Sequence, residues 1–167
     1  MCKWIMFALS VLVISGCSRA GGGGYTAGDL RAKNHVVGQS INWFKVNGYY
    51  APGLGGGYCC VMLPDKWRPG LKAHVEWEVD PNPKEDIPMQ KEGFGYDKEA
   101  YARHKANYRK YKAVVDIPEY GEERCGITVH FLPCNQVKAT TICDGYGTPN
   151  YPIKEPLDMK EPAYCPK

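Results

Sequence analysis

The 167-residue chain lacks the sequence motifs of the common enzyme classes. It contains no GxSxG elbow, no HExxH zinc motif, no P-loop and no glycine fingerprint for a dinucleotide. Serine is nearly absent after residue 16, where only Ser18 and Ser40 occur. The four histidines are scattered, and Glu76 and Glu78 are expected on a solvated strand face. These absences predict a protein that is not an enzyme, with no catalytic residues, no metal and no cofactor.

The sequence also lacks a strong charge of one sign and an apolar run of membrane-spanning length. Its formal net charge of +3 is too small to indicate a nucleic-acid partner. The apolar run at residues 4–16 would extend about 20 Å as a helix, short of the roughly 30 Å hydrocarbon core of a bilayer. With Lys3 in front of it, this run predicts a signal peptide over residues 1–16.

The signal ends in the letters ISGC, residues 14–17, which resemble the lipobox of bacterial lipoproteins. In that family the cysteine carries fatty acyl chains such as palmitate, and cleavage occurs just before it. The resemblance implies that Cys17 is lipidated and anchors the chain, because two or more acyl chains bind a bilayer stably. By resemblance to lipoprotein sorting in Gram-negative bacteria, Ser18 in place of aspartate implies the outer membrane, with the domain facing the periplasm. The alternative is an ordinary secretory signal with a chance cysteine.

The rest of the chain divides into a linker and one domain. Four consecutive glycines at 21–24 favour a flexible tether. We therefore expect a signal peptide at 1–16, a lipidated Cys17 with a Gly-rich tether at 17–33, and a single β-rich domain with a Pro-rich tail at 34–167. The last part is long enough for one hydrophobic core.

Beyond Cys17 the cysteine count is even, which predicts a disulfide framework in an exported chain. The candidates are Cys59, Cys60, Cys125, Cys134, Cys143 and Cys165. The absence of a CxxC motif disfavours the rival interpretation, a metal site. Adjacent strand residues point to opposite faces, which opposes a bond between Cys59 and Cys60.

Residues 125–143 predict a β-hairpin with one bridge across it. Its first half alternates apolar and polar side chains, and its second half is rich in β-branched residues. A two-residue turn at Cys134-Asn135 would place Cys125 and Cys143 one residue out of register, so a bulge or a diagonal approach would bring them together. Cys134 would then need a distant partner such as Cys165, or stay free.

Short strands dominate the remaining pattern. Strands are expected at 36–46, 58–63, 71–80 and 113–117, with an Asn47-Gly48 turn, a loop at 49–57 and one helix at 97–112 that Asp97 caps. The clearest is 71–80, where apolar and polar side chains alternate strictly. The fold class is mainly β: a small antiparallel β-sandwich or open barrel with one short helix, stabilised by disulfides.

Three stretches resemble a family of small Gram-negative lipoproteins with the motif CCxxLPxxWxPG. They read YCCVMLPDKWRPGLKAHVEWEVD, YKAVVDIPEYG and ITVHFLP, within about 34–152. The matching residues are Cys59, Cys60, Leu63, Pro64, Trp67, Pro69, Gly70, Val75, Trp77, Ile117, Pro118, Tyr120, Val129, His130, Phe131, Leu132 and Pro133. The sequence departs from the pattern at Cys134-Asn135, where the family typically has Asn-Gly, and in the extra cysteines Cys125, Cys134, Cys143 and Cys165.

Several members of that family are linked to type VI secretion lipase effectors, as their immunity proteins. The resemblance therefore implies a lipoprotein that binds and neutralises such a lipase. One alternative is an envelope structural or ligand-binding lipoprotein that recognises lipid headgroups, a glycan or another envelope protein. Another is a periplasmic thiol oxidoreductase that uses Cys59 and Cys60.

Two groups of aromatic and basic residues are candidates for partner binding, because aromatic side chains dominate interface energetics. The first lies in or beside the Gly-rich loop and comprises Tyr49, Tyr50, Leu54 and Tyr58. The second lies in the expected helix and comprises Tyr101, Arg103, Lys105 and Arg109. For the second group the alternative is an ordinary solvated helix face.

Overall fold

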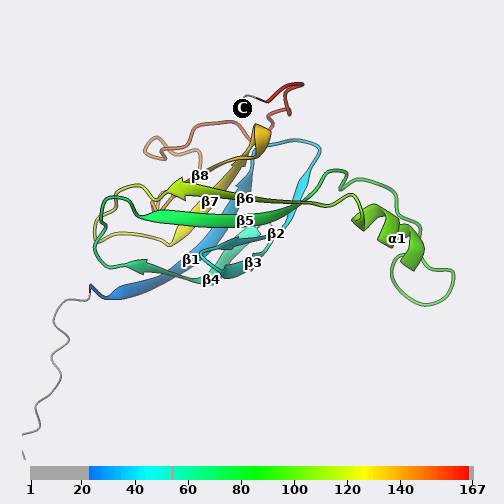
Figure 1. Ribbon diagram of the computed structural model, residues 1–167, viewed down its shortest axis with the longest axis horizontal. Coiled ribbons are helices and arrows are strands. Elements are labelled where there is room, and N and C mark those ends of the chain that lie inside the picture. The colour runs from blue at the N-terminus through cyan, green and yellow to red at the C-terminus, as the bar shows by residue number, and fades with distance from the viewer. Residues whose placement is uncertain (1–22, 54, 166–167) are drawn as a thin grey trace, which may run out of the picture.

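The computed structural model describes residues 23–53 and 55–165, which form two four-stranded sheets around one core (Figure 1). The strand order is β4-β1-β7-β8 in the first sheet and β3-β2-β5-β6 in the second. The strands are β1 (Tyr25–Asn34), β2 (Ser40–Val46), β3 (Tyr49–Pro52), β4 (Gly55–Pro64), β5 (Lys72–Asp80), β6 (Arg109–Asp116), β7 (Ile127–Leu132) and β8 (Gln136–Thr140). The helices are α1 (Lys98–Lys105) and the short 3-10 turn η1 (Pro133–Asn135). The predicted fold class is confirmed.

Apolar side chains from both sheets meet between the layers. In β5 the alternation predicted from sequence is present, with Val75 and Trp77 buried. The Phe131 ring of β7 lies 5.3 Å from the Trp77 ring and 5.9 Å from the ring of Phe44 in β2. These contacts join the two sheets. All strand pairs are antiparallel except β1 and β7, which run parallel.

The domain begins earlier than the sequence predicted. Residues 25–33, expected in the tether, belong to β1, which lies between β4 and β7 and buries Leu30 and Ala32 in the core. Only these two side chains of β1 are buried, so its apolar pattern is weak. Its strand conformation depends on hydrogen bonds to neighbours on both sides. The predicted signal peptide and the predicted lipidation site, Cys17, lie outside the described residues. No helix among the described residues is long and apolar enough to cross a membrane.

The helix is shorter than expected, and a strand takes up its second half. Asp97 caps α1 as predicted, accepting a 2.9 Å hydrogen bond from the Ala100 amide. The segment 109–112, however, is part of β6, which pairs with β5 and packs Tyr111 against Trp77 at 5.6 Å. Exposure alternates along β6, so a period of two fits this segment better than a helical period.

The segment expected as a loop at 49–57 contains two strand segments. The Asn47-Gly48 turn, with φ of 51° and 86°, connects β2 to β3 as a tight hairpin. The next strand, β4, begins at residue 55 rather than 58. The proline in this segment does not prevent a strand, because β3 is a short strand at the edge of its sheet.

Two of the three disulfides follow the sequence argument. Cys125 bonds to Cys143 and Cys134 bonds to Cys165. The hairpin turn has three residues instead of two, which shifts the register by one and removes the expected offset between Cys125 and Cys143. Cys134, Glu161 and Cys165 have metal-ligand spacing, but the disulfide leaves one carboxylate as a ligand.

The third disulfide corrects the prediction, because Cys59 bonds to Cys60. The expected alternation fails at a β-bulge: Gly28 pairs with Val61 and Asp29 pairs with Cys59, so Cys60 is the extra residue. A bulge places two residues opposite one, and the two side chains no longer point to opposite faces.

Candidate functional site

The residues of the CCxxLPxxWxPG segment and of the later IPEYG segment connect two distant parts of the chain. The Trp67 indole N–H donates a 2.9 Å hydrogen bond to the Ile117 carbonyl oxygen. The Tyr120 hydroxyl donates a 2.8 Å hydrogen bond to the Pro64 carbonyl oxygen. These bonds fix the turn after β4 to the loop between β6 and β7, so the motif is primarily a structural connection.

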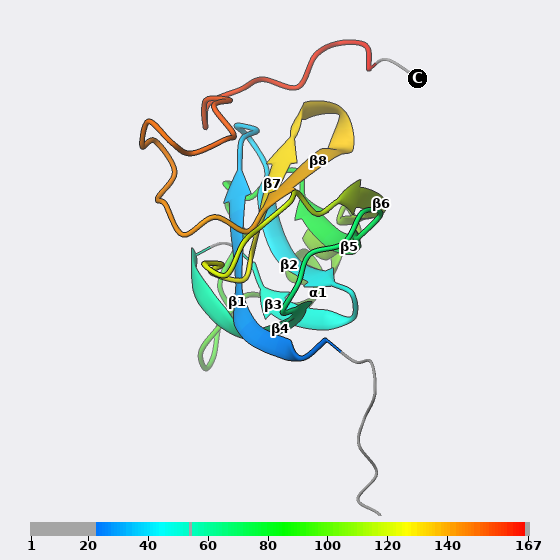
Figure 2. The same cartoon turned by 90° about the vertical axis from the view of Figure 1, so that its left-hand side faces the viewer.

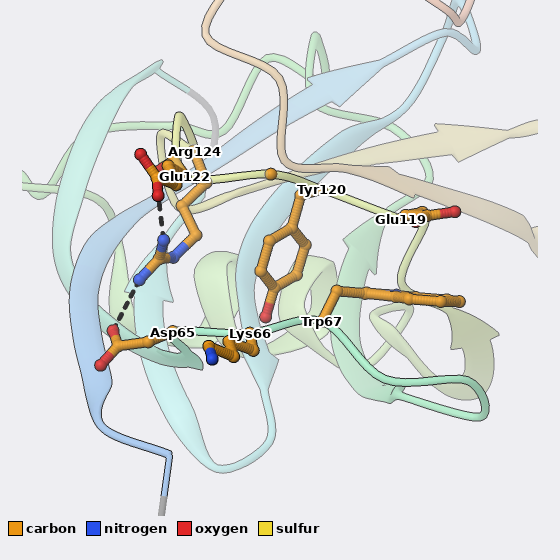
Figure 3. Close-up of a pocket in the computed structure, with 8 residues that line it drawn as sticks. Asp65, Lys66, Trp67, Glu119, Tyr120, Glu122 and Arg124 are labelled. Carbon is orange, nitrogen blue, oxygen red and sulfur yellow. Dashed lines mark hydrogen bonds and ion pairs between the residues drawn. The ribbon is translucent and has the colours of Figure 1, made fainter.

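A buried arginine completes this connection (Figure 3). The Arg124 side chain is 9% exposed, and its Nη2 donates to Asp65 Oδ1 at 2.7 Å and to Thr26 Oγ1 at 2.8 Å. Its Nη1 donates to the Glu122 carbonyl oxygen at 3.1 Å, and the guanidinium lies 5.7 Å from the Tyr120 ring centre. Charge-assisted bonds of this kind hold the loop in one conformation.

A cleft of about 480 Å³ lies between the turn and the loop. It is lined by Asp65, Lys66, Trp67, Glu119, Tyr120, Gly121, Glu122 and Arg124 (Figure 3). Burial raises the pKa of Tyr120, so its hydroxyl keeps its proton, and its bond to Pro64, to a higher pH than an exposed tyrosine would. The lining contains no serine, cysteine or histidine, and its aromatic and charged groups suit binding of a small polar molecule.

We expect Trp67→Phe to lower the free energy of unfolding by about 1–2 kcal/mol. The substitution keeps an aromatic ring but leaves the Ile117 carbonyl without its indole donor. Urea denaturation followed by circular dichroism measures the change. An equal loss in Trp43→Phe, whose indole makes no such bond to Ile117, would show that the Trp67 hydrogen bond is unimportant.

A second surface lies on the outer face of the β3-β2-β5-β6 sheet. We call it the aromatic platform and define it by Trp43, Lys45, Tyr50 and Lys110. The Trp43 and Tyr50 rings stack at 6.4 Å, and the ammonium groups of Lys45 and Lys110 lie 5.6 and 5.9 Å from the Trp43 ring. Tyr50 is 54% exposed and Trp43 is half-buried, so both rings are accessible.

Cross-strand register builds this platform. Trp43 pairs with Glu78, which in turn pairs with Lys110 on β6. Glu78 is largely buried and accepts a 3.2 Å hydrogen bond from Asn42 Nδ2, while its other oxygen lies 3.7 Å from Lys110 Nζ. The carboxylate therefore anchors Lys110 beside the indole. Cations over aromatic faces are a recognised binding arrangement.

The structure separates the residues of the first predicted group. Tyr50 belongs to the platform, whereas Tyr49 pairs with Val46 in β2 and is 39% exposed at the sheet edge. Tyr58 lies on β4 in the other sheet and packs partly against the core. Leu54 lies outside the described residues.

The structure also divides the second predicted group. Tyr101, Arg103 and Lys105 are exposed on α1, where the Tyr101 ring stacks on Tyr96 at 5.8 Å. Arg109 lies on β6 instead. Neither predicted group included Trp43 or Lys45, and Lys110 was expected within the helix at 97–112 rather than on β6. Their meeting with Lys110 depends on strand order, which the pattern does not contain.

Helix α1 is fastened to the second sheet by a buried ion cluster. His104 Nε2 lies 3.0 Å from Asp80 Oδ2, and His104 Nδ1 lies 2.7 Å from Glu85 Oε2. His104 and Asp80 are both nearly inaccessible to solvent. The hydrogen bond to Glu85 raises the pKa of His104, burial opposes this, and Asp80 adds to the rise. Sequence reasoning treated this histidine as isolated, because its partners lie on other elements.

Comparison with known proteins identifies the family of the domain. Residues 33–139 match a family described as "Protein of unknown function (DUF3304)". No curated protein and no solved structure matches the chain significantly. The matched region covers more than half of the chain and includes both motif segments that carry Trp67 and Tyr120. The chain therefore belongs to the DUF3304 family.

Proposed function

We propose that this protein is a periplasm-facing lipoprotein that binds and neutralises a type VI secretion lipase effector as its immunity protein. In this proposal Cys17 anchors the chain in the outer membrane, and the domain blocks the lipase by steric contact. The domain itself performs no chemical step. The proposal combines the lipobox and motif resemblance with the aromatic platform.

The platform is the observation that supports partner binding most directly. Two adjacent aromatic rings, Trp43 and Tyr50, stand on a rigid sheet rather than on a loop. A pre-formed aromatic surface loses little conformational entropy on binding, and tryptophan and tyrosine are enriched in interface hot spots. Lys45 and Lys110 add positive charge, so the complementary surface on the lipase is acidic or rich in carbonyl groups.

Binding should depend strongly on the two rings. We expect the double variant Trp43→Ala/Tyr50→Ala to raise the Kd for the proposed cognate lipase effector by about 30-fold or more, the size of a hot-spot loss. Isothermal titration with the purified lipase measures this change. Circular dichroism checks that the sheet is intact, which we expect because both rings lie on its outer face.

A charge reversal on each surface distinguishes the aromatic platform from α1 as the binding site. Lys110→Glu should weaken the complex, whereas Lys105→Glu, the same change on α1, should leave the Kd unchanged. The reverse result would move the binding surface to α1. If the gene deletion leaves cells unharmed under attack by a sibling strain, and the wild-type domain does not bind the lipase, the immunity role is wrong.

The cleft beside Trp67 favours the second candidate function, recognition of a small envelope ligand. Its volume of about 480 Å³ lies within the range of small-molecule sites, and its walls are fixed by the bonds of Trp67, Tyr120 and Arg124. The same attack assay distinguishes the two functions. Loss of protection in the platform variant supports the immunity role, and retained protection with lost ligand binding in Trp67→Ala supports the ligand role.

A further inference from the structure

The C-terminal segment crosses the outer side of the first sheet and is held at both ends. We call residues 144–164 the strap. Cys143, directly before it, bonds to Cys125, and Cys165, directly after it, bonds to Cys134 in the turn between β7 and β8. Figure 2 shows this orange-to-red segment passing outside β1 and β7. Between its ends Met159 exchanges backbone hydrogen bonds with His35 and Val37, at 2.8 and 2.9 Å.

Beneath the strap, three side chains form a buried chain of hydrogen bonds. The Tyr151 hydroxyl of the strap lies 2.7 Å from His130 Nε2, and His130 Nδ1 lies 2.7 Å from His35 Nε2. His35 Nδ1 lies 2.9 Å from the carbonyl oxygen of Pro156, again in the strap. Both histidines are fully buried, and Tyr151 is 2% exposed.

The acceptor at one end of this series of hydrogen bonds determines which ring nitrogens carry hydrogen. The Pro156 carbonyl can only accept, so His35 Nδ1 carries a hydrogen and, in a neutral ring, His35 Nε2 accepts. His130 Nδ1 must then donate to His35, and His130 Nε2 accepts from the Tyr151 hydroxyl. Each bond has one proton with both rings neutral. The strap thus supplies the first donor and the last acceptor.

The sheet face under the strap is positively charged. Lys33 on β1 and Lys138 on β8 are the register neighbours of His130, and Arg31 lies in the next row, where it bonds to Asp29. The strap contacts two of these groups: Glu155 pairs with Lys138, whose side chain is still half exposed, and the Tyr146 ring lies 5.9 Å from Lys33 Nζ. Thr128 precedes His130 on the same face of β7. Among the described acidic side chains, Glu155 is the one whose charge favours a proton on His130.

We propose that the strap is an acid-opened cover: protonation of His130 releases residues 146–157 from the sheet while the two disulfides hold the ends and the sandwich stays folded. An added proton must go to His130 Nε2, since Nδ1 already carries one. It would face the Tyr151 oxygen, whose hydroxyl would have to give up its donor role. The new charge would also lie between Lys33 and Lys138. Opening brings water to the ring, relieves both conflicts and removes Glu155 and Tyr146 from Lys138 and Lys33.

The direction of the pH dependence follows from the two states. Burial and the neighbouring His35 lower the pKa of His130 to about 3 in the closed state; Glu155 acts against this, and Lys33 and Lys138 act with it. An exposed histidine has a pKa of about 6.5. The closed state is therefore fully favoured above about pH 6.5 and loses stability as the pH falls below it. One histidine shifted in this way increases the open population by about 30-fold between pH 8 and pH 5.

Lys138 lowers the pKa of Glu155, so this carboxylate remains ionised at pH 5. Both partners of the Glu155–Lys138 pair therefore keep their charge over the window in which His130 acts, so titration of Glu155 does not itself open the strap. The pKa of Tyr151 is raised by burial, and its hydroxyl keeps its proton throughout. Loss of strap protection between pH 6.5 and pH 5 would thus report on the histidine rather than on either neighbour.

Hydrogen exchange measured by mass spectrometry on the full chain, kept in a nonionic detergent, tests the proposal. Protection factors, referred to the unstructured rate at each pH, should fall by about 30-fold in strap peptides between pH 8 and pH 5. Peptides from β5 and β6 should keep their protection. Simultaneous loss in the strap and in β5, or unchanged strap protection at pH 5, would overturn the proposal. This wild-type comparison stands without any variant.

A matched pair of variants assigns the effect to its residue. His130→Gln keeps one donor and one acceptor but does not titrate, so its strap protection should be independent of pH. His74→Gln makes the same change on the exposed face of β5 and should retain the wild-type pH dependence. A wild-type pH dependence in His130→Gln would place the acid sensor elsewhere and refute the role of His130.

Discussion

Replacing Gly126 by alanine is expected to lower the free energy of unfolding by about 4 kcal/mol, among the largest effects of a single substitution. Gly126 directly precedes β7 and has φ of 82°, a region that alanine disfavours. An added Cβ would overlap the backbone nitrogen and carbonyl oxygen of Asp29. Asp29 lies in β1, the strand that pairs with β7, so relief of the overlap requires separation of central strands of the first sheet.

Gly121 provides the matched control for this substitution. It lies in the same loop before β7, its φ is not positive, and a methyl group added to its Cα would have no neighbouring atom within 4 Å. We expect Gly121→Ala to stay within about 0.5 kcal/mol of the wild type. Urea denaturation of both variants measures the difference. Equal stabilities would mean that β1 and β7 adapt to the methyl group, and that their close approach is not required.

Replacing His104 by alanine is expected to cost about 3 kcal/mol, because it leaves the buried Asp80 carboxylate without its cationic partner. The loss should concentrate in α1, since His104 is the side chain that connects this helix to Asp80 on β5 and to Glu85. Hydrogen exchange of an α1 peptide and urea denaturation measure the local and global parts. Arg103→Ala, an exposed change in the same helix turn, should have little effect. Equal losses in both variants would refute the cluster.

The His104 cluster and the strap respond to pH in opposite directions. Because the pKa of His104 is raised in the folded state, chiefly by Glu85, its contribution to stability is complete below about pH 6.5. It is lost as the pH rises through the folded-state pKa. Acid therefore loosens the strap, whereas alkali loosens α1. Exchange measured at both ends of the pH range should show the two segments losing protection separately.

This separation also bears on the proposed function. Tyr101, Arg103 and Lys105 depend on the position of α1 and therefore on the His104 cluster. Trp43 and Tyr50 lie on paired strands, and their position does not depend on the His104 cluster. A binding surface on the platform should be insensitive to alkaline release of α1. The two aromatic and basic clusters can therefore be distinguished by their response to alkaline pH, because only the cluster on α1 depends on His104.

Local patterns alone were sufficient for several elements of the fold. The strict alternation at 71–80 predicts β5, Asn47-Gly48 predicts a tight turn, and Asp97 predicts the start of α1. Each of these depends on a residue's own conformational preference or on a period of two along one strand. The even cysteine count likewise predicts a disulfide framework. The hairpin pattern predicts the bridge between Cys125 and Cys143, because a hairpin brings its two ends together whatever surrounds it.

Only the tertiary structure decided the elements whose residues are stabilised by distant partners. The strand β1 has few apolar side chains and exists through hydrogen bonds to β4 and β7, while the bulge that joins Cys59 to Cys60 arises from its register with β1. The chain from Tyr151 through the two histidines spans more than 100 positions of sequence. The sequence by itself determined that this is a disulfide-stabilised β domain with short strands. Which side chains meet depends on strand order and register, and these are set by packing and hydrogen bonds between segments that no local pattern connects.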